Sequence, residues 1–170
     1  MSDVITAVKG QVTEHNETAE ECFSIQELEE KVTLLMAFEI KKSKCAFVKE
    51  INIDSLQQIN GDVNSLVQVL NNLITNAIEA SKSGNTVTFG AYKIDCNVIF
   101  LVRNLGQKIP EEIQEKIFNK MITTKGKNGT GLGLYISKSI IKVRFNGEVY
   151  FETNDKETTF FVRIPLAEEE

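Results

Sequence analysis

Apolar side chains recur every three or four residues in three long stretches of the chain, and this spacing predicts three helices. The predicted helices cover residues 24–44, 65–82 and 134–144. Ser24 suits the start of the first helix, because a serine followed three residues later by Glu27 forms a capping box. A further, shorter helix is predicted from Pro110, where a proline and two acids stand in a first helical turn.

Alternating apolar and polar residues, or runs rich in β-branched residues, predict strands between the helices. These segments are residues 46–53, 86–93, 97–103, 148–153 and 158–164, with a short edge strand at 57–60. Turns at residues 95–97 and 154–155 would make antiparallel hairpins of the strands that flank them. This mixture of helices and strands predicts an α+β fold in which helices cover one mixed sheet.

The polar side chains of the predicted helix 65–82 are mainly amides. At about 100° per residue, its apolar residues gather on one side, and another side carries a polar row formed by Ser65, Gln68, Asn72, Asn76 and Glu79. Asparagine is a mediocre helix former, so this row is either a solvated surface without a role or a binding site. Amide oxygens one turn apart suit Mg²⁺, which usually binds through few protein oxygens together with substrate phosphates. The row therefore makes a nucleotide the ligand to expect.

A second candidate site is the sequence Gly-Thr-Gly-Leu-Gly at residues 129–133, which opens the predicted helix 134–144. Glycine lets the backbone approach phosphates, and the free N–H groups at a helix start attract anions. The sequence is neither a Walker loop, which needs Gly-Lys-Ser/Thr, nor a Rossmann loop, which needs GxGxxG directly after a strand. Lys125 and Lys127 stand just before it and would add positive charge. A flexible surface loop is the alternative interpretation.

Composition narrows the classes of function. The chain has 170 residues, enough for one domain, and its 42% hydrophobic and 25% charged residues are ordinary for a soluble protein. Its net charge of −5 argues against a general nucleic-acid surface. The three cysteines have no CxxC spacing, so we expect neither a zinc site nor a disulfide framework, and a reducing cytoplasm as the location. No apolar run approaches the length of a membrane helix, so we expect no membrane contact by this chain.

Three segments, in this order and spacing, resemble the catalytic, ATP-binding domain of sensor histidine kinases. They are the asparagine-bearing helix, residues 102–112 (Val-Arg-Asn-Leu-Gly-Gln-Lys-Ile-Pro-Glu-Glu) and residues 117–138, which include the glycine-rich sequence. The resemblance covers about residues 23–166. Sensor histidine kinases belong to the superfamily of gyrase, heat-shock chaperones, histidine kinases and MutL, so the resemblance includes this superfamily. It implies a Bergerat-type α/β sandwich, in which three helices cover one face of a mixed sheet and ATP lies between helices under a flexible lid.

The resemblance implies a role for each matching residue. Asn72 and Asn76 match the asparagine motif of the family, with Asn76 as the Mg²⁺ ligand and Asn72 as the catalytic residue that positions phosphate or water. Asn104 and Gly106 match the first glycine motif, which holds adenine, and residues 118–125 match a phenylalanine motif and the lid. The implied ATP-binding residues are Asn72, Asn76, Asn104, Gly106, Ile109, Thr124, Lys125, Gly129, Thr130, Gly131, Leu132 and Gly133.

Several positions depart from the family's pattern. Asn104 stands where the family usually has an aspartate that accepts a hydrogen bond from the adenine amino group. An amide oxygen accepts without charge assistance, so weaker ATP binding is expected. Lys108 replaces a second glycine of that motif, which would restrict the loop or add a cation near the nucleotide. Glu79 replaces a residue that is often basic, so contact with the terminal phosphate would pass to Lys125 or Lys127.

We expect residues 1–22 to be the tail of a preceding dimerisation helix and a linker, residues 23–166 the ATP-binding domain, and residues 167–170 an acidic tail. The family phosphorylates a histidine on a separate helical dimerisation domain, where it stands before an acid in an amphipathic helix. His15 lies in a polar run instead, so we expect the phosphoacceptor histidine upstream and little turnover by this chain alone. The resemblance further implies a response regulator as downstream partner. We expect this chain to be a monomer. The sequence leaves open whether the parent protein is anchored in a membrane.

Two other functions fit the same motifs. One is a scaffold or regulatory module of the same fold whose nucleotide binding is impaired, for which Asn104 and Lys108 are the signs. The other is an anti-sigma-type protein-serine kinase, which shares the motifs. An ATP-driven clamp like the chaperones is the least favoured, because those chains need large extra domains and have a catalytic glutamate where Asn72 stands.

Overall fold

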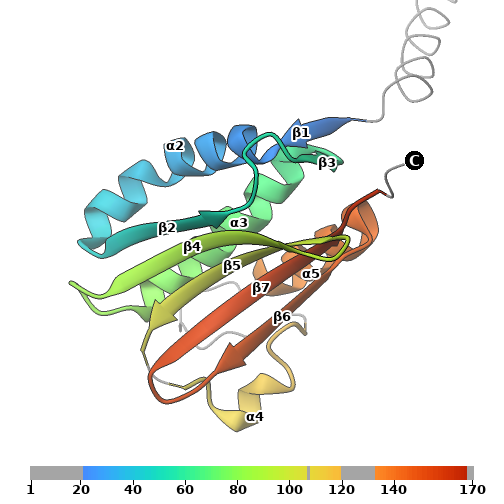
Figure 1. The fold of residues 1–170 in the computed structure, drawn as a ribbon. Coiled ribbons are helices and arrows are strands. Elements are labelled where there is room, and N and C mark those ends of the chain that lie inside the picture. The colour runs from blue at the N-terminus through green and yellow to red at the C-terminus, as the bar shows by residue number, and fades with distance from the viewer. Residues whose placement is uncertain (1–20, 107, 120–132, 168–170) are drawn as a thin grey trace, which may run out of the picture.

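The chain forms a five-stranded sheet with helices layered on one of its faces (Figure 1). The structure, a computed structural model, describes residues 21–106, 108–119 and 133–167. The described elements are β1 (Cys22–Ser24), α2 (Ile25–Ser43), β2 (Ala46–Asn52), β3 (Gln58–Asn60), α3 (Val63–Ala80), β4 (Thr86–Ile94), β5 (Asn97–Leu105), α4 (Glu111–Gln114), α5 (Gly133–Phe145), β6 (Glu148–Thr153) and β7 (Glu157–Pro165).

The main sheet has the strand order β2–β4–β5–β7–β6. β2 runs parallel to β4 and the other neighbouring pairs are antiparallel, so the prediction of a mixed sheet is confirmed. Both predicted hairpins are observed, as β4 with β5 and β6 with β7. The short strand predicted at 57–60 is observed as β3, but it pairs with β1 in a separate two-stranded sheet. The sequence does not predict β1, because three residues are too few to show a period.

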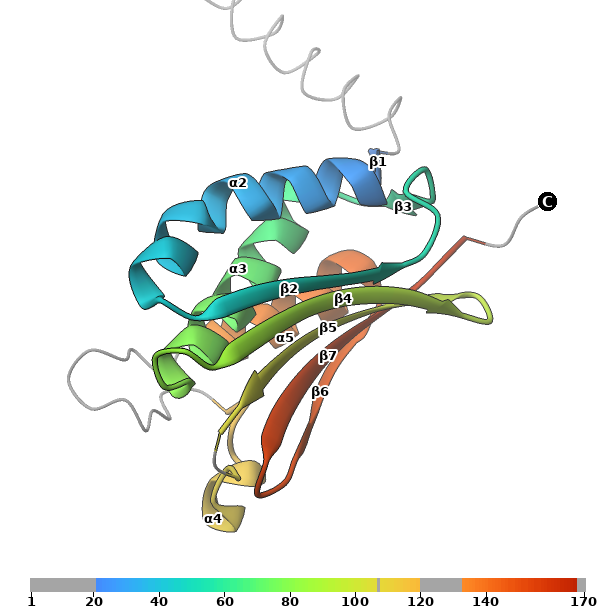
Figure 2. The ribbon, with the colours of Figure 1, turned by 60° about the vertical axis from the view of Figure 1, so that its left-hand side comes forward.

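Helix α3 lies between α2 and α5, and these three helices cover the same face of the sheet (Figures 1 and 2). The inward positions of β5 are the buried residues Val98, Phe100 and Val102. Helix α3 contributes buried leucines to the same core, at Leu66, Leu70 and Leu73. The alternate residues of β5, Ile99 and Leu101, are buried as well, so this central strand is apolar on both of its faces.

Side-chain caps determine where two of the helices begin. Ser24 Oγ accepts a hydrogen bond from the N–H of Glu27 at 3.1 Å, which confirms the predicted cap. Helix α3 begins at Val63 rather than at residue 65, because the Asp62 carboxylate accepts from the N–H groups of Asn64 and Ser65 at 3.2 and 3.1 Å. The Asp62 cap is the first of several contacts that fix the orientation of α3.

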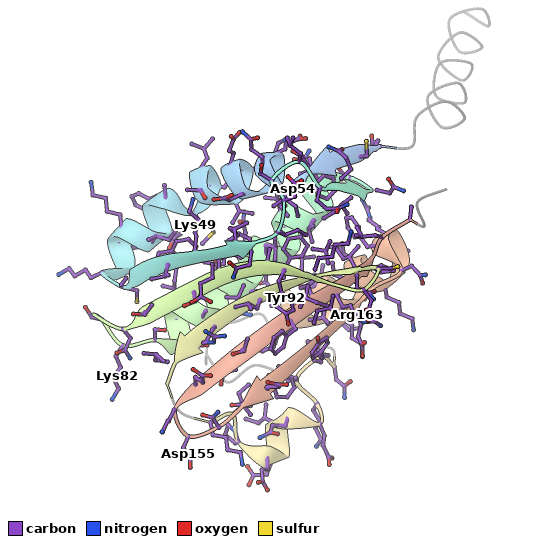
Figure 3. All side chains as sticks on the ribbon, in the orientation of Figure 1. Lys49, Asp54, Lys82, Tyr92, Asp155 and Arg163 are labelled. Atoms are coloured by element: carbon purple, nitrogen blue, oxygen red, sulfur yellow. The ribbon has the colours of Figure 1, made fainter. Side chains whose placement is uncertain are left out.

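The face of the sheet away from the helices carries paired charges around aromatic rings. Tyr92 and Arg163 stand on this outer face (Figure 3). Arg163 Nη2 lies 3.0 Å from Glu148 Oε2, and the rings of Tyr150 and Phe161 stack with their centroids 5.0 Å apart. These two pairs of side chains lie on the outer face, whereas Asn72 and Asn104 lie on the opposite, helix-covered side of the sheet.

Cys22, Cys45 and Cys96 are free thiols. Among the described residues, no helix combines the length and the apolar character needed to span a membrane. The same part of the chain contains no cluster of three or more histidine, cysteine or acidic side chains that could hold a metal ion.

Candidate functional site

The polar row of α3 faces α5. Asn72 Nδ2 donates a hydrogen bond to Ser137 Oγ at 3.2 Å, and Arg144 Nη1 donates to Ser65 Oγ at 2.7 Å. Ser65 precedes Asn72 on α3, whereas Arg144 follows Ser137 on α5, so the two helices run antiparallel. Asn76, one turn beyond Asn72, therefore lies toward the end of the contact at which α5 begins. The amide side chains of α3 therefore lie next to the first turns of α5.

Glycine at position 133 lets the two helices meet closely. A Cβ atom added to Gly133 would lie 2.8 Å from Asn72 Nδ2 and 2.9 Å from its Cγ, which is inside van der Waals contact. Ser137, only 2% exposed, follows one turn later on α5. The amide of Asn72 is therefore held between Gly133 and Ser137.

Most of the predicted lid and triphosphate-binding residues lie outside the described part of the chain. These are Thr124, Lys125, Gly129, Thr130, Gly131 and Leu132. Their roles stay predictions. Gly133 is the member of the second glycine motif that the structure places, and it lies directly beside Asn72.

The other end of the α3–α5 contact is fixed by a clamp of Asp62, Ser65 and Arg144. Ser65 Oγ donates to Asp62 Oδ2 at 2.8 Å, and Arg144 Nη1 lies 4.0 Å from the same carboxylate oxygen. The hydrogen bond from the Ser65 side chain, helped by backbone N–H donors and opposed by burial, holds the pKa of Asp62 below its usual value. Gly61 leaves room for Phe145, since a Cβ on Gly61 would lie 2.5 Å from Cε1 of that ring. The clamp sets the rotation of α3 and so the direction of its amide row.

Asn104 is a buried polar residue at the end of β5. It continues the inward row of β5 and is 5% exposed, and the equally buried Thr158 of β7 is its direct partner across the two strands. The N–H of Gly106 donates to the carbonyl of Lys156 at 3.0 Å. A Cβ on Gly106 would lie 3.3 Å from the carbonyl oxygen of Ala80 and 3.4 Å from Asn104 Nδ2. The first glycine motif is thus packed against the last turn of α3.

Both glycine motifs therefore contact α3, one at Asn72 and the other at its C-terminal end. In Figure 3 this C-terminal end is marked by Lys82, which follows α3. At the residues that the structure describes, Gly133 lies beside Asn72 and Gly106 lies beside Ala80, and the joint role of the three motifs stays a prediction. Asn76 lies on α3 between the two contacts and is half-buried.

The segment that follows Gly106 is attached to the β6–β7 hairpin. The N–H of Ile109 donates to Thr153 Oγ1 at 3.0 Å, and its carbonyl accepts from Gln114 Nε2 at 2.7 Å. Thr153 Oγ1 lies 2.7 Å from Thr158 Oγ1, the neighbour of Asn104 across the sheet. Ile109 is therefore linked to the Asn104 region through two threonines. The ammonium of Lys108, in contrast, lies 3.2 Å from Glu111 Oε1, an exposed ion pair.

The predicted phenylalanine motif is described only at its beginning. Phe118 packs against Phe151 and Phe160, with ring centroids 6.0 and 6.2 Å away. Lys138 Nζ of α5 lies 5.6 Å from the centroid of the Phe118 ring. Phe118, which follows α4 in the chain, thus packs against the sheet and lies beside Lys138 of α5.

The sequence motifs do not include two polar residues that the structure places beside Asn72 and Asn104, namely Ser137 and Thr158. Both carry a signal in the sequence, because each is a polar residue at an inward position of an otherwise apolar row. Ser137 precedes the buried Ile141 by one helical turn, and Thr158 shares the inward face of β7 with Phe160 and Val162. A polar residue in such a row needs a partner, and the partners are Asn72 and Thr153.

The sequence of residues 61–168 matches the family described as histidine kinase-, DNA gyrase B-, and HSP90-like ATPase. Sporulation kinase A of Bacillus subtilis (strain 168) is 38% identical over 108 residues, which make up 63% of this chain and 18% of that protein. Sporulation kinase C of the same strain is 34% identical over 84% of this chain and 33% of that protein. The chain thus spans a third or less of the length of these curated relatives.

Solved structures show the same fold. The nucleotide-free catalytic domain of the histidine kinase ThkA superposes with a TM-score of 0.77 at 34% identity, over 87% of this chain and 96% of that one. ThkA in complex with the response regulator protein TrrA gives a TM-score of 0.74 at 28% identity, over 98% of this chain and 49% of that chain.

The fold and the meeting of the two glycine motifs on α3 define an ATP-binding domain of the Bergerat type. The chain belongs to the histidine kinase-, DNA gyrase B-, and HSP90-like ATPase family. The relatives named above are histidine kinases or sporulation kinases, and the resemblance inferred from the sequence is confirmed.

Gly133→Ala is expected to push the Asn72 amide away from Ser137. The added methyl overlaps that amide, and Ser137 Oγ then stays buried without its partner, so the free energy of unfolding should fall by about 1–3 kcal/mol. Urea denaturation measures the change. In an Asn72→Ala background the methyl has room, and the same substitution should cost less than about 0.5 kcal/mol. Equal costs in both backgrounds would contradict the close approach of Gly133 to Asn72.

Proposed function

We propose that this chain is the catalytic domain of a sensor histidine kinase. It binds Mg-ATP and directs the γ-phosphate toward a histidine on a separate helical dimerisation domain, with a response regulator as the next partner. The observation that carries the proposal is the placement of Asn72 between Gly133 and Ser137, because it joins the amide row of α3 to the start of α5. The relatives support it by their names, and the ThkA–TrrA complex supports a response regulator as partner.

The residues present suit a purine nucleotide. Asn104 offers a buried amide at the end of an apolar row, which is the kind of group that reads the edge of a base. Gly106 lacks the Cβ that would crowd Ala80 and Asn104, so the backbone there leaves space beside the amide. We place the base at Asn104 and the phosphates at the start of α5, where free N–H groups of a first helical turn favour anions.

We assign the Mg²⁺ to Asn76. Mg²⁺ prefers oxygen ligands and usually binds through one or two protein groups together with phosphates, which fits a single amide oxygen on α3. When bound, Mg²⁺ neutralises phosphate charge and helps align the triphosphate. Asn72 then acts from one turn away: its Nδ2 donates to Ser137, and its Oδ1, which lies beside Gly133 at the start of α5, accepts a hydrogen bond from a water molecule next to the phosphates.

Positioning and charge stabilisation are the main demands of phosphoryl transfer, and they are what these residues supply. The clamp of Asp62, Ser65 and Arg144 supports this role at a distance, since it fixes the rotation of α3 that aims Asn72 and Asn76. Lys125 is proposed to contact the terminal phosphate, in place of the basic residue that Glu79 replaces. Three free thiols fit activity in a reducing cytoplasm.

One observation favours a scaffold that no longer binds nucleotide, and it is the neutral amide of Asn104. This residue replaces a charged acceptor, and the nearby Lys108 pairs with Glu111 rather than pointing at a ligand held by Asn104. Titration calorimetry separates the two functions. Heat of binding with Mg-ATP supports the kinase domain, whereas no heat up to millimolar Mg-ATP would select the scaffold.

Asn76→Ala should weaken Mg²⁺-dependent ATP binding by more than about 100-fold, because it removes the protein ligand of the metal. Calorimetry with Mg-ATP measures the loss, and far-UV circular dichroism checks that the fold is kept. The matched control is Asn64→Ala, which removes an exposed asparagine from the first turn of the same helix. Unchanged binding by Asn76→Ala would show that the polar row of α3 has been misinterpreted.

Phosphotransfer from labelled ATP tests the acceptor. The chain alone should take up little label, and addition of the histidine-bearing helical domain of the parent protein should give acid-labile phosphate on that domain. Strong self-labelling at His15 would contradict an acceptor elsewhere. Labelling of a serine-bearing antagonist protein instead would select the anti-sigma-type kinase.

A further inference from the structure

The side chain of Asn104 is a buried amide at the end of β5. It is 5% exposed, and its amide makes no hydrogen bond to another described residue. Among the described residues, three side-chain atoms are fully enclosed and have no hydrogen-bond partner: Thr33 Oγ1, Asn71 Oδ1 and Arg103 Nε. The polar atoms of Asn104 are not among these enclosed atoms. The amide of Asn104 therefore reaches space that the described residues do not fill. In the proposed function that space holds the base.

An amide differs from a carboxylate in what it can recognise. An ionised carboxylate only accepts hydrogen bonds, whereas an amide has one accepting oxygen and one donating nitrogen. Adenine presents a donating amino group at C6 beside an accepting N1, and a 6-oxopurine presents an accepting O6 beside a donating N1–H. The two patterns are mirror opposites. Rotation of an asparagine amide by half a turn about its last bond exchanges its oxygen and nitrogen, so one side chain can match either base.

The neighbours of Asn104 do not select one rotation of its amide. Thr158, its partner across the strands, shares a hydrogen bond with Thr153, and either hydroxyl can be the donor. Such hydroxyl hydrogens rotate to suit what they face. Gly106 approaches the Asn104 amide with no side chain of its own. Thr158 and Gly106 are therefore compatible with both orientations of the amide.

We propose that Asn104 allows the site to accept 6-oxopurine nucleoside triphosphates, those of hypoxanthine and guanine, in addition to ATP. The inference rests on the proposed function, because the base must lie against Asn104 for its amide to matter. An aspartate at the same position would accept from the adenine amino group and repel O6. The substitution of an amide for that carboxylate thus broadens the choice of base.

Titration calorimetry of the whole chain with the Mg²⁺ complexes of ATP, ITP and GTP tests the proposal. ITP is the sharpest probe, since its base differs from adenine only at C6 and N1. The dissociation constants of ATP and of at least one of ITP and GTP should agree within about tenfold. In Asn104→Asp the preference for ATP over these nucleotides should rise by roughly 10- to 100-fold, the discrimination that a matched pair of hydrogen bonds provides.

The matched control is Asn52→Asp, which adds the same charge at an exposed position. Asn52 pairs with Tyr92 and Asn104 with Val87, so they lie near opposite ends of β4. The control should leave the ratio of affinities unchanged. If Asn104→Asp does not fold, the dissociation constants of ATP, ITP and GTP for the natural chain still test the proposal.

The outcomes separate this inference from the proposed function. Binding of ATP with exclusion of both ITP and GTP by more than about 100-fold would overturn the inference and leave the nucleotide-binding function intact. A failure to bind any of the three nucleotides would overturn the proposed function, and the inference with it.

Discussion

The contact of the Asn72 amide with the start of α5 is the interaction on which the rest of the site depends. Asn72 lies between a glycine that cannot obstruct it and a buried serine that holds its nitrogen. One hydrogen bond of this kind contributes only about 0.5–1.5 kcal/mol, so it does not hold the helices together by itself. The buried leucines of α3 do that, at about 1.5–3 kcal/mol each. The amide contact instead sets the rotation of α3 about its own axis, because it fixes which atoms of α3 face the first turn of α5.

Contacts at both ends of α3 hold this rotation in place. At its start, the Asp62 cap and the Ser65–Arg144 hydrogen bond fix the rotation of α3 against α5. At its end, the carbonyl of Ala80 lies against Gly106, and the edge of the sheet presents Asn104. A polar row between two such fixed ends can hold a ligand that spans them, with a base at one end and phosphates at the other. We propose that this ligand is the nucleotide of the ATPase family to which the chain belongs.

The sequence predicts the helices and most of the strands because the period of apolar residues is a local property of the chain. It also predicts Asn72, Asn76, Asn104, Gly106 and Gly133 as site residues, since their motifs are local too. The pairing of β3 with β1 could not be predicted, because it joins segments too short to show a pattern. The roles of Ser137 and Thr158 depend on which residue of a distant element lies opposite, and only the tertiary fold supplies that. The burial of Asn104 likewise became visible only when the register of β5 was known.

A nuclear magnetic resonance titration of the ¹⁵N-labelled chain with Mg-ATP tests the nucleotide site most directly. The largest shifts are expected in the side-chain amide signals of Asn72, Asn76 and Asn104 and in the backbone signals of Gly106 and Gly133. The outer face of the sheet, around Tyr92 and Arg163, should stay unchanged. Shifts confined to that outer face, or a spectrum indifferent to millimolar Mg-ATP, would contradict the claim that α3 joins two glycine motifs into one nucleotide site.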